Sequence, residues 1–379
     1  MAQYYVDGTI TSANGSGSGT ISDPWGKTDD LFQYAVDQIL AGAGAGATGD
    51  WVNVVAGDLT ATASVDLSSY SGSSKNLYLV GHNGHQPTYD LGGETMFADR
   101  YDSVGLHNIR FINFSNVNAV DGITLKYRGF VTNCVFDGQD QDYESVLDVS
   151  GAVNILGCRW INFSPSPSTN HGYLLKNGSH GGNWIKGCYF EKGGNDNNPF
   201  LFSYNSVIED CVFRYSGTDS IGYMILPIRN LRLSNCTFYA TPTAGNVNAT
   251  FFSTYLENSM INCYFENLQE PIYNSQYTVN DNSSTMLAGN RAYNSSNLYP
   301  SQDYVPGKTV IYQDNDWDVS ESLLVDPLNG DYRPKAELIG AGFNLQDYGF
   351  PSSIKKAKPT IGGINAFETT AKPAPRVRG

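Results

Sequence analysis

The sequence predicts an all-β protein built as a β-solenoid, a stack of short coils, and three observations predict it. The first is an internal repeat, because "RFINFS" at Arg110–Ser115 is nearly copied as "RWINFS" at Arg159–Ser164. The second is that the same pattern returns at "VTNCVF", "IKGCYF", "IEDCVF", "LSNCTF" and "MINCYF", at steps of 23 to 30 residues. The third is that helical periodicity is absent between the copies, where Asn, Ser, Gly and Tyr dominate.

Each copy has four recurring positions. Position zero is the residue just before Arg110 or Arg159 in the two quoted hexapeptides, and the equivalent residue in the other copies. Position zero is Ile109, Cys134, Cys158, Cys188, Cys211, Cys236 and Cys263. Position +2 is aromatic: Phe111, Phe136, Trp160, Phe190, Phe213, Phe238 and Phe265. Position −1 is Asn, Gly or Asp: Asn108, Asn133, Gly157, Gly187, Asp210, Asn235 and Asn262. Position −3 is aliphatic or Met in every copy.

These positions predict an interior and a corner. Zero and +2 share one face of a strand, because strand side chains alternate with period two. The residue types at −1 tolerate the left-handed conformation, so the chain bends there and position −3 belongs to a different strand. Stacked coils would therefore carry internal ladders of Cys, aliphatic and aromatic side chains, and the repeats would bury their apolar faces against one another.

At this point the chain resembles the right-handed parallel β-helix proteins of the pectin-lyase-like superfamily, including phage and bacterial β-helix repeat proteins. In that family a left-handed Asn often stands at the corner between the second and third strands, as Asn108, Asn133, Asn235 and Asn262 do here. The opening "YYVDGTITSANGSGSGTISDPW" and "TDDLFQYAVDQIL" is similar to the family's first strand, glycine-rich loop and capping helix, with Thr28 as the expected N-cap. "GDWVNVVAGDLT" resembles the first coil, and "VDPLNGDYRPKAELIGAGF" with "IGGINAFE" resembles a closing segment.

The resemblance implies one continuous solenoid rather than several domains. Residues 1–75 are expected to form an N-terminal cap with a helix and the first coil, and residues 76–300 the parallel β-helix coils. Residues 301–354 would be an irregular closing segment, followed by a basic, extended tail at 355–379. The superfamily contains enzymes, adhesins and inert structural proteins, so the fold alone does not give the function.

Composition excludes several classes of function. The formal net charge is −14, which argues against nucleic acid as a partner. All six Cys occupy position zero, which predicts apolar fillers of the core rather than a disulfide framework or a zinc site. No apolar run approaches the ~20 residues of a membrane span, and no secretory signal precedes "MAQYYVDG". We therefore expect assembly in a host cytoplasm and residence on a virion, with an extracellular or cell-surface location as the alternative.

Candidates for chemistry are few. The densest carboxylate cluster is "DGQDQDYE", with Asp137, Asp140, Asp142 and Glu144, and its oxygens could bind Ca²⁺ in a lyase or act on a glycosidic bond. Lys126, Arg128 and Arg159 are expected as neighbours one coil away, where an Arg could act as the base of a lyase. The competing interpretation is a solvated outer loop between coils. His82 and His85 in "GHNGH" suggest a turn more than a metal pair. The catalytic sets of polygalacturonases and pectate lyases are absent, and no metal or other cofactor is expected for a structural protein.

Two features suggest partners. The tail has six basic residues against Glu368, and an extended basic arm suits an acidic partner surface or a neighbouring copy in a homo-oligomer: Lys355, Lys356, Lys358, Lys372, Arg376 and Arg378. Several tyrosines lie outside the inward phase and would suit sugar rings: Tyr143, Tyr173, Tyr204, Tyr215, Tyr223, Tyr255, Tyr273 and Tyr277.

Three hypotheses follow. The first is a non-enzymatic structural or display protein, a capsid-decoration or tail-associated component of a phage virion that docks through its termini onto other virion proteins and contacts glycans. The alternative is a polysaccharide lyase or glycoside hydrolase, such as a tailspike depolymerase, that cleaves acidic polysaccharide with the Asp137–Glu144 cluster. The second alternative is a secreted bacterial surface adhesin.

Overall fold

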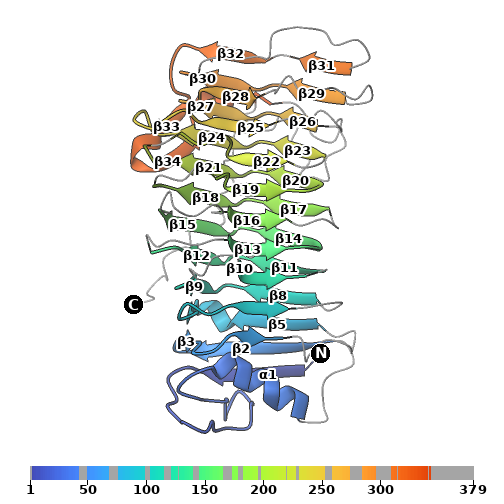
Figure 1. The fold of residues 1–379 in the computed structure, drawn as a ribbon, viewed down its shortest axis with the longest axis vertical. Coiled ribbons are helices and arrows are strands. Elements are labelled where there is room, and N and C mark those ends of the chain that lie inside the picture. The colour runs from blue at the N-terminus through green and yellow to red at the C-terminus, as the bar shows by residue number, and fades with distance from the viewer. Residues whose placement is uncertain are drawn as a thin grey trace, which may run out of the picture.

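The computed structural model shows an elongated stack of coils whose strands form three parallel sheets of 12, 11 and 9 strands in the described residues (Figure 1). This is a right-handed parallel β-helix, the fold that the repeat and the resemblance predict. The described residues are 2–41, 49–67, 76–98, 103–114, 121–126, 128–139, 145–164, 173–177, 182–194, 198–218, 220–227, 230–251, 258–273, 284–295, 309–313, 315–339 and 341–342.

The three sheets are numbered here by the order in which a coil passes through them. The first sheet contains β1 (Ala2–Asp7), β2 (Asp50–Ala56), β5 (Asn76–Gly81), β8 (Ser103–His107), β11 (Arg128–Thr132), β14 (Ala152–Leu156), β17 (Asn183–Lys186), β20 (Ser206–Glu209), β23 (Leu231–Ser234), β26 (Asn258–Ile261), β29 (Ser284–Ala288) and β31 (Thr309–Gln313). The second contains β3 (Leu59–Thr60), β6 (Thr88–Asp90), β9 (Arg110–Ile112), β12 (Val135–Asp137), β15 (Arg159–Phe163), β18 (Tyr189–Lys192), β21 (Val212–Tyr215), β24 (Thr237–Ala240), β27 (Tyr264–Glu266), β30 (Arg291–Tyr293) and β32 (Asp316–Val319). The third contains β4 (Val65–Asp66), β7 (Met96–Ala98), β10 (Asp121–Leu125), β13 (Ser145–Val149), β16 (Tyr173–Asn177), β19 (Leu201–Ser203), β22 (Ile225–Pro227), β25 (Asn248–Phe251) and β28 (Glu270–Tyr273).

Like residues stack on like along the interior. Phe136, Trp160 and Phe190 are fully buried, and their rings stack with centroids 4.7 and 4.4 Å apart. The ladder continues through Phe213 and Phe238 at 4.9 Å per step, close to the ~4.8 Å spacing of paired strands. The six Cys are buried and unbridged in the same interior. Strict register therefore turns a weak sequence pattern into a continuous hydrophobic core.

The corner between the first and second sheets has the left-handed backbone that position −1 predicts. All seven corner residues have φ between 51° and 63°. The chain bends there within one residue, and backbone hydrogen bonds join the corners of successive coils, as from Asn133 N–H to Leu156 O and from Asp210 N–H to Ser234 O. The bend does not interrupt the stack.

Position zero has a hydrogen-bonding role that the sequence pattern did not reveal. The thiol of Cys158 donates to Val131 O, the −3 carbonyl one coil earlier, at 3.3 Å, whereas the thiol of Cys236 lies closer to Ser234 O of its own coil, at 3.3 Å, than to Ile208 O one coil earlier, at 3.6 Å. Cys211 Sγ also accepts from Cys188 N–H at 3.4 Å. The thiols link successive coils as well as filling space.

In the coils after Cys263, an asparagine occupies position zero and makes the hydrogen bonds between coils. Asn290 follows the left-handed Gly289 and is fully buried. Its Nδ2 donates to Met260 O at 2.9 Å, and its Oδ1 accepts from Cys263 N–H at 2.9 Å. Asn315 repeats the arrangement one coil later, with Nδ2 on Leu287 O at 2.9 Å and Oδ1 accepting from Asn290 N–H at 3.0 Å. The carboxamide supplies a stronger donor and acceptor in the position of the thiol.

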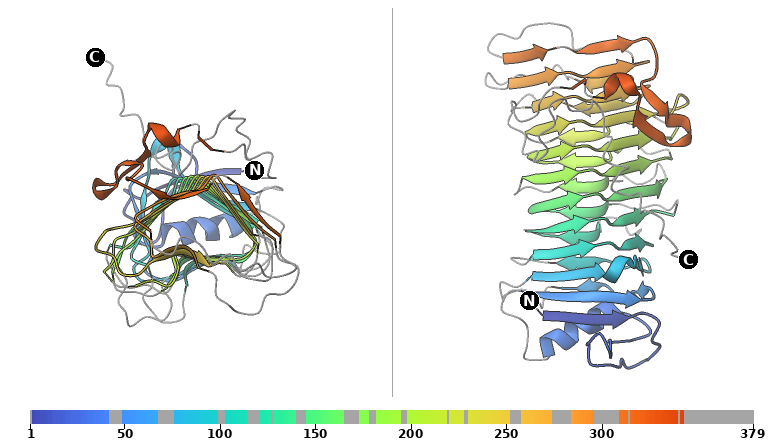
Figure 2. Two further views of the ribbon diagram at one scale, coloured as in Figure 1. Left: turned by 90° about the horizontal axis from the view of Figure 1, so that it is seen from above. Right: turned by 180° about the vertical axis from the view of Figure 1, so that it is seen from behind.

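The N-terminal end of the stack is covered by the helix α1 (Leu31–Ala41), which lies across the coil when viewed along the axis (Figure 2). Leu31, Ala35 and Ile39 are buried as the apolar stripe predicts, whereas Leu40 is exposed. The expected N-cap at Thr28 is wrong, because the helix begins only at Leu31. The backbone before the helix is instead fixed by the Asp30 carboxylate, which accepts from the N–H and hydroxyl of Thr62 at 2.7 Å each.

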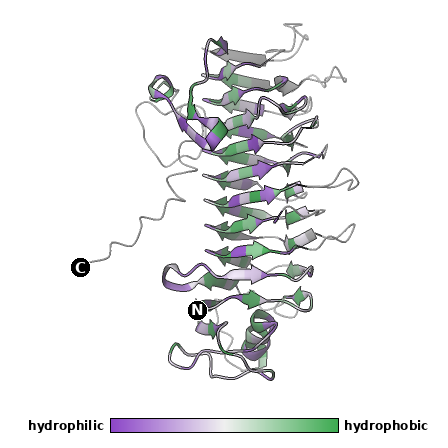
Figure 3. Cartoon of the chain, turned by 90° about the vertical axis from the view of Figure 1, so that its left-hand side faces the viewer, coloured by the Kyte–Doolittle hydropathy of each residue, from purple (hydrophilic) through white to green (hydrophobic). Residues whose placement is uncertain are grey.

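The C-terminal part differs from the expected boundaries. The coils were expected to end near residue 300, but β31 and β32 still pair in register with β29 and β30, so the stack continues to Val319. The chain then returns along the outer face of the second sheet as the closing flap, residues 321–339, seen beside the upper coils in Figures 2 and 3. The flap contains the antiparallel pair β33 (Leu324–Asp326) and β34 (Asp331–Pro334) and the 3₁₀ turns η3 (Pro327–Asn329) and η4 (Ala336–Leu338). No helix in the described residues is long and apolar enough to cross a membrane.

The corner conformation can be tested at Asn133, which is exposed and has φ 54°. We expect Asn133→Ala to lower the free energy of unfolding by about 1–2 kcal/mol, because a Cβ without a local polar partner disfavours this conformation. Asn133→Gly should be nearly neutral. Urea denaturation of the three proteins measures the difference, and equal stability of the Ala and Gly variants would contradict the role of the bend.

The bridging role of position zero can be tested at Asn290. Asn290→Val is close in volume but leaves Cys263 N–H and Met260 O without their partner, so it should cost about 1–3 kcal/mol for each stranded group. Asn290→Cys should cost less, because a thiol occupies this position in the six preceding coils. The order of unfolding midpoints in denaturant checks this, and a Cys variant no more stable than the Val variant would refute it.

Candidate functional site

Asp137, the first residue of the predicted acidic cluster, lies at the end of β12 and is buried. Its Oδ1 accepts from Asn162 Nδ2 at 3.0 Å and from Gln139 N–H at 3.1 Å, and its Oδ2 pairs with Arg110. Burial by itself works to raise the pKa of Asp137, but the hydrogen bonds from Asn162, Arg110 and Gln139 and the charge of Arg110 outweigh it and hold the pKa below the ordinary value. Both oxygens are therefore engaged in fixing a turn.

This turn explains why "INFS" occurs twice. Asn113 directly follows β9 and Asn162 lies near the end of β15, at equivalent positions of the repeat, with φ 53° and 56°. Each donates to the Asp one coil earlier, since Asn113 Nδ2 lies 2.7 Å from Asp90 Oδ1 as Asn162 Nδ2 lies 3.0 Å from Asp137 Oδ1. The repeated hexapeptide encodes a second left-handed corner with an Asp–Asn link between coils.

The other residues that the sequence proposed for catalysis do not assemble around Asp137. Asp140, Asp142 and Glu144 lie outside the described residues. The predicted basic neighbours are used elsewhere: Lys126 lies over the Phe97 ring, Arg159 lies over the Tyr189 ring, and Arg128 is exposed. The cation that binds Asp137 is Arg110, the first residue of the quoted repeat.

The histidine pair forms a turn. His82 belongs to the short 3₁₀ turn η2 (His82–Gly84) and packs edge-on against Tyr5, with ring centroids 5.6 Å apart. His85 Nε2 lies 2.9 Å from Gly57 O. In the part of the chain that the structure describes, no group of three or more His, Cys, Asp or Glu is placed to hold a metal ion.

A second acidic group, Glu209, lies on the outer side of the first sheet beside the corner residue Asp210. Glu209 is 1% exposed, and its Oε2 accepts from Trp184 Nε1 at 3.0 Å and lies 3.4 Å from Lys186 Nζ. Burial, which the charge of Lys186 and the bond from Trp184 offset only in part, raises the pKa of Glu209. Its near-complete burial leaves no access for a substrate, so this group also has a structural role.

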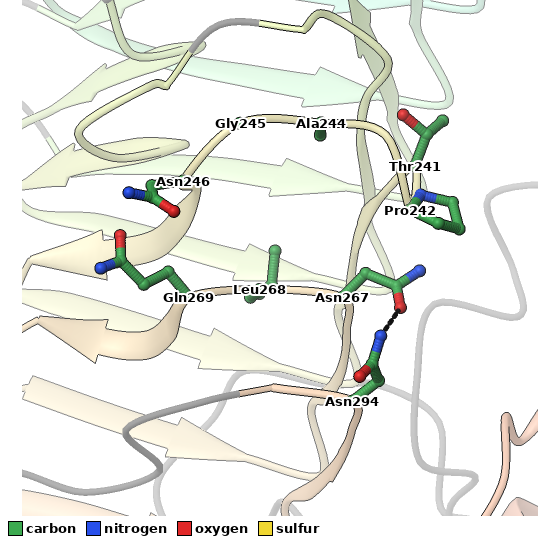
Figure 4. A pocket seen from close by; sticks show the side chains of 9 residues that line it. All are labelled: Thr241, Pro242, Ala244, Gly245, Asn246, Asn267, Leu268, Gln269 and Asn294. Atoms are coloured by element: carbon green, nitrogen blue, oxygen red, sulfur yellow. Dashed lines mark hydrogen bonds between the residues drawn. The ribbon is translucent and has the colours of Figure 1, made fainter.

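The structure contains an open pocket of about 190 Å³ on the turns that lead from the second to the third sheet (Figure 4). Three successive coils line it: Thr241, Pro242, Ala244, Gly245, Asn246, Asn267, Leu268, Gln269 and Asn294. Asn246 and Gln269 lie side by side on neighbouring turns, and Asn294 Nδ2 donates to Asn267 Oδ1 at 2.7 Å. Nothing in the sequence points to this pocket except the pair of turn asparagines.

The positions of the pocket residues follow from the turns that carry them. Asn267 and Asn294 have φ 57° and 46°, the same second corner that Asn113 and Asn162 form in earlier coils. Asn267 is further held by Nδ2 on Ala240 O at 3.0 Å, and Asn246 N–H donates to Ser220 Oγ at 3.1 Å. The carboxamides are thus presented on a rigid scaffold, and none of the nine lining residues is ionisable. Such a lining can hydrogen-bond to hydroxyls but offers neither acid nor base.

Two further sequence expectations meet the structure only in part. Tyr215, one of the tyrosines expected to be exposed, is fully buried, and its hydroxyl donates to Gly194 O at 3.1 Å. Tyr173, Tyr204 and Tyr223 are half-buried. Tyr143, Tyr255 and Tyr277, the side chain of Tyr273, and the whole basic tail at 355–379 lie outside the described residues.

The comparisons with known proteins support the fold. No family model matches this sequence, and no curated protein sequence matches it. Among solved structures, the chain is similar to a crystal structure of the pectate lyase Pel9A, with a TM-score of 0.53, 12% sequence identity, and coverage of 96% of this chain and 96% of that chain. The chain therefore has the pectin-lyase-like β-helix fold along nearly its whole length, and at this identity the likeness extends to the fold alone.

The structural role of Asp137 predicts a pH dependence. Because its pKa is lowered in the folded protein, its contribution to stability is fully present above the ordinary Asp pKa and is lost as the pH falls through the lowered value. Asp137→Asn should therefore lower the free energy of unfolding by about 1–3 kcal/mol at neutral pH. The difference from wild type should shrink below about pH 4. Denaturation of both proteins across this range measures it, and a difference independent of pH would contradict the assignment.

Proposed function

We propose that this protein is a non-enzymatic structural rod displayed on a virion or a comparable surface, which contacts neutral glycans through the amide-lined pocket. The pocket carries the proposal, because it offers convergent carboxamides on three coils and no titratable side chain. Sugar hydroxyls both donate and accept hydrogen bonds, and Asn and Gln side chains do the same. A pocket without an acid, a base or a metal ligand can bind a sugar, but it has no group to catalyse the cleavage of a glycosidic bond.

The size of the pocket suits a single sugar residue rather than a long groove. Its volume of about 190 Å³ lies below the ~300–1,000 Å³ of drug-sized ligand sites. Its openness to solvent at the turns would let a terminal or branching sugar enter from outside. Weak contacts of this kind gain strength when many copies are displayed together.

The β-helix supports a display role. From β4 to β28 the coils are joined by backbone ladders in three sheets, and by stacked side chains inside, so the rod resists local opening. The basic tail and the acidic remainder of the chain suit docking of the tail onto an acidic partner, either another virion protein or a second copy. Assembly into a homo-oligomer belongs to the same proposal.

The proposal predicts binding without cleavage. Purified protein should retain neutral oligosaccharides on a glycan array, while incubation with acidic and neutral polysaccharides, with and without Ca²⁺, should release neither unsaturated products nor new reducing ends. Asn246→Ala should weaken binding by about three- to tenfold, since it removes one or two hydrogen bonds. Asn154→Ala, an equally exposed Asn on the first sheet, is the matched control and should bind like wild type.

The outcomes separate the hypotheses. Cleavage of an acidic polysaccharide would overturn the structural role and would direct mutagenesis to Asp140, where Asp140→Asn should then abolish activity. Binding that is unaffected by Asn246→Ala would place the glycan contact elsewhere on the rod. Absence of any binding across the array would remove the glycan contact and leave only the display role.

A further inference from the structure

The closing flap covers an aromatic strip on the outer face of the second sheet. Leu324, Tyr332 and Leu338 of the flap are each 1% exposed. They pack against outward residues of four successive strands, β18, β21, β24 and β27: Tyr189, Val212, Tyr239 and Tyr264. The Tyr332 ring centroid lies 6.1 Å from that of Tyr189 and 5.4 Å from that of Tyr239. The flap thus clamps four coils together from outside.

A buried carboxylate lies where the flap meets the solenoid. Glu266, the last residue of β27, is 4% exposed. Its Oε2 accepts from Ser322 Oγ of the flap at 2.7 Å and from Tyr264 Oη at 2.8 Å. Tyr264 Oη in turn accepts from the flap's Leu323 N–H at 2.9 Å, and Lys335 Nζ donates to Ser322 O at 2.6 Å. One carboxylate therefore organises the polar contacts between flap and solenoid.

Charged and titratable residues of both the solenoid and the flap surround Glu266. On the solenoid, Tyr239 of β24 and Tyr293 of β30 are its neighbours in register. From the flap, Lys335 is the nearest cation, and it is shared with Glu321, whose Oε2 lies 3.5 Å from Lys335 Nζ.

Further along the strip lie the Arg214–Glu191 pair and Asp326. The flap therefore covers a carboxylate that has only one shared cation near it among these groups.

Burial raises the pKa of Glu266, and the hydroxyls of Ser322 and Tyr264 and the charge of Lys335 offset only part of this effect. When the flap lifts, the carboxylate is hydrated and its pKa returns toward the ordinary value. A group with a raised pKa in the docked state stabilises docking most below the ordinary pKa, and this contribution is lost as the pH rises through the raised value. The sign is opposite to that of Asp137, whose pKa is lowered by hydrogen bonds from Asn162, Arg110 and Gln139 and by the charge of Arg110.

We propose that the closing flap is a latch that acid tightens, with Glu266 as its proton-binding group. Protonated Glu266 can be covered without burying a charge, and it still accepts a hydrogen bond from the flap. At neutral and alkaline pH the covered carboxylate opposes docking, so the flap opens more often. Opening uncovers the strip of Tyr189, Tyr239 and Tyr264 and releases the external clamp on four coils.

Hydrogen exchange of full-length protein tests the latch, with rates corrected for the intrinsic effect of pH. The probe is the amide of Leu323, which donates to Tyr264 Oη of the solenoid and therefore crosses the junction between flap and solenoid. Its protection should fall several-fold between pH 4.5 and pH 8 in the wild type. The Val135 amide, bonded to Ile109 O in coils outside the strip that the flap covers, is the reference and should not follow this change.

Two variants separate the proton-binding group from the rest of the flap. Glu266→Gln is permanently neutral, so it should keep the flap protected at pH 8 and abolish the pH dependence. Glu337→Gln, an exposed carboxylate of the flap, is the matched control and should behave as wild type. The proposal is overturned if wild-type protection is flat or rises with pH, or if Glu266→Gln keeps the wild-type slope or loses protection at every pH.

Discussion

The left-handed corner between the first and second sheets is the constraint on which the rest of the structure depends. A single residue with positive φ bends the chain in each coil, so equivalent residues stack on equivalent residues at every step. After the bend, the side chain at position zero lies close to the −3 carbonyl one coil earlier, and at Cys211 and Asn290 it also accepts from the position-zero N–H one coil earlier. A small donor and acceptor is needed there, and Cys or Asn supplies both. The corners stack in register from coil to coil, and the aromatic residues at +2, which follow each corner directly, therefore stack in register as well.

Charge is handled in two opposite ways on the outside of this stack. Asp137 is covered but surrounded by donors, with an exposed Arg110 to balance it, so its charged form is favoured. Glu209 and Glu266 are covered with fewer compensating groups, so their protonated forms are favoured. Carboxylates on an outer face of a β-helix are where hydrolytic chemistry would be sought, yet each of these three holds neighbouring coils or the flap in place. The neutral pocket at Asn246 and Gln269 is instead open to solvent.

Prediction from sequence succeeded where the repeat is regular and failed where the residue type changed without a change of role. The seven corners and the interior ladder could be assigned by alignment alone, since each has the same residue class at the same step. Asn290 and Asn315 were missed, because a search for Cys at position zero stops at Cys263 and a buried Asn resembles an ordinary turn residue. The duplicated Asn113 and Asn162 were seen as a repeat, but their bonds to Asp90 and Asp137 join residues more than twenty positions apart. No local pattern contains that information.

The sequence by itself determined the coil and its period, because the left-handed corner, the alternation of side chains and the spacing of aromatic residues are local properties of each repeat. Only the tertiary structure decided which polar groups are covered and which face solvent. Asp137 was one of four candidate catalytic carboxylates in the sequence, and it is a structural residue because Arg110 and Asn162 from the adjacent coils occupy its oxygens. Likewise the flap sequence gives no sign that Ser322 and Lys335 lie over Glu266. Such contacts depend on where the closing flap packs against the coils, and the repeat pattern does not encode that position.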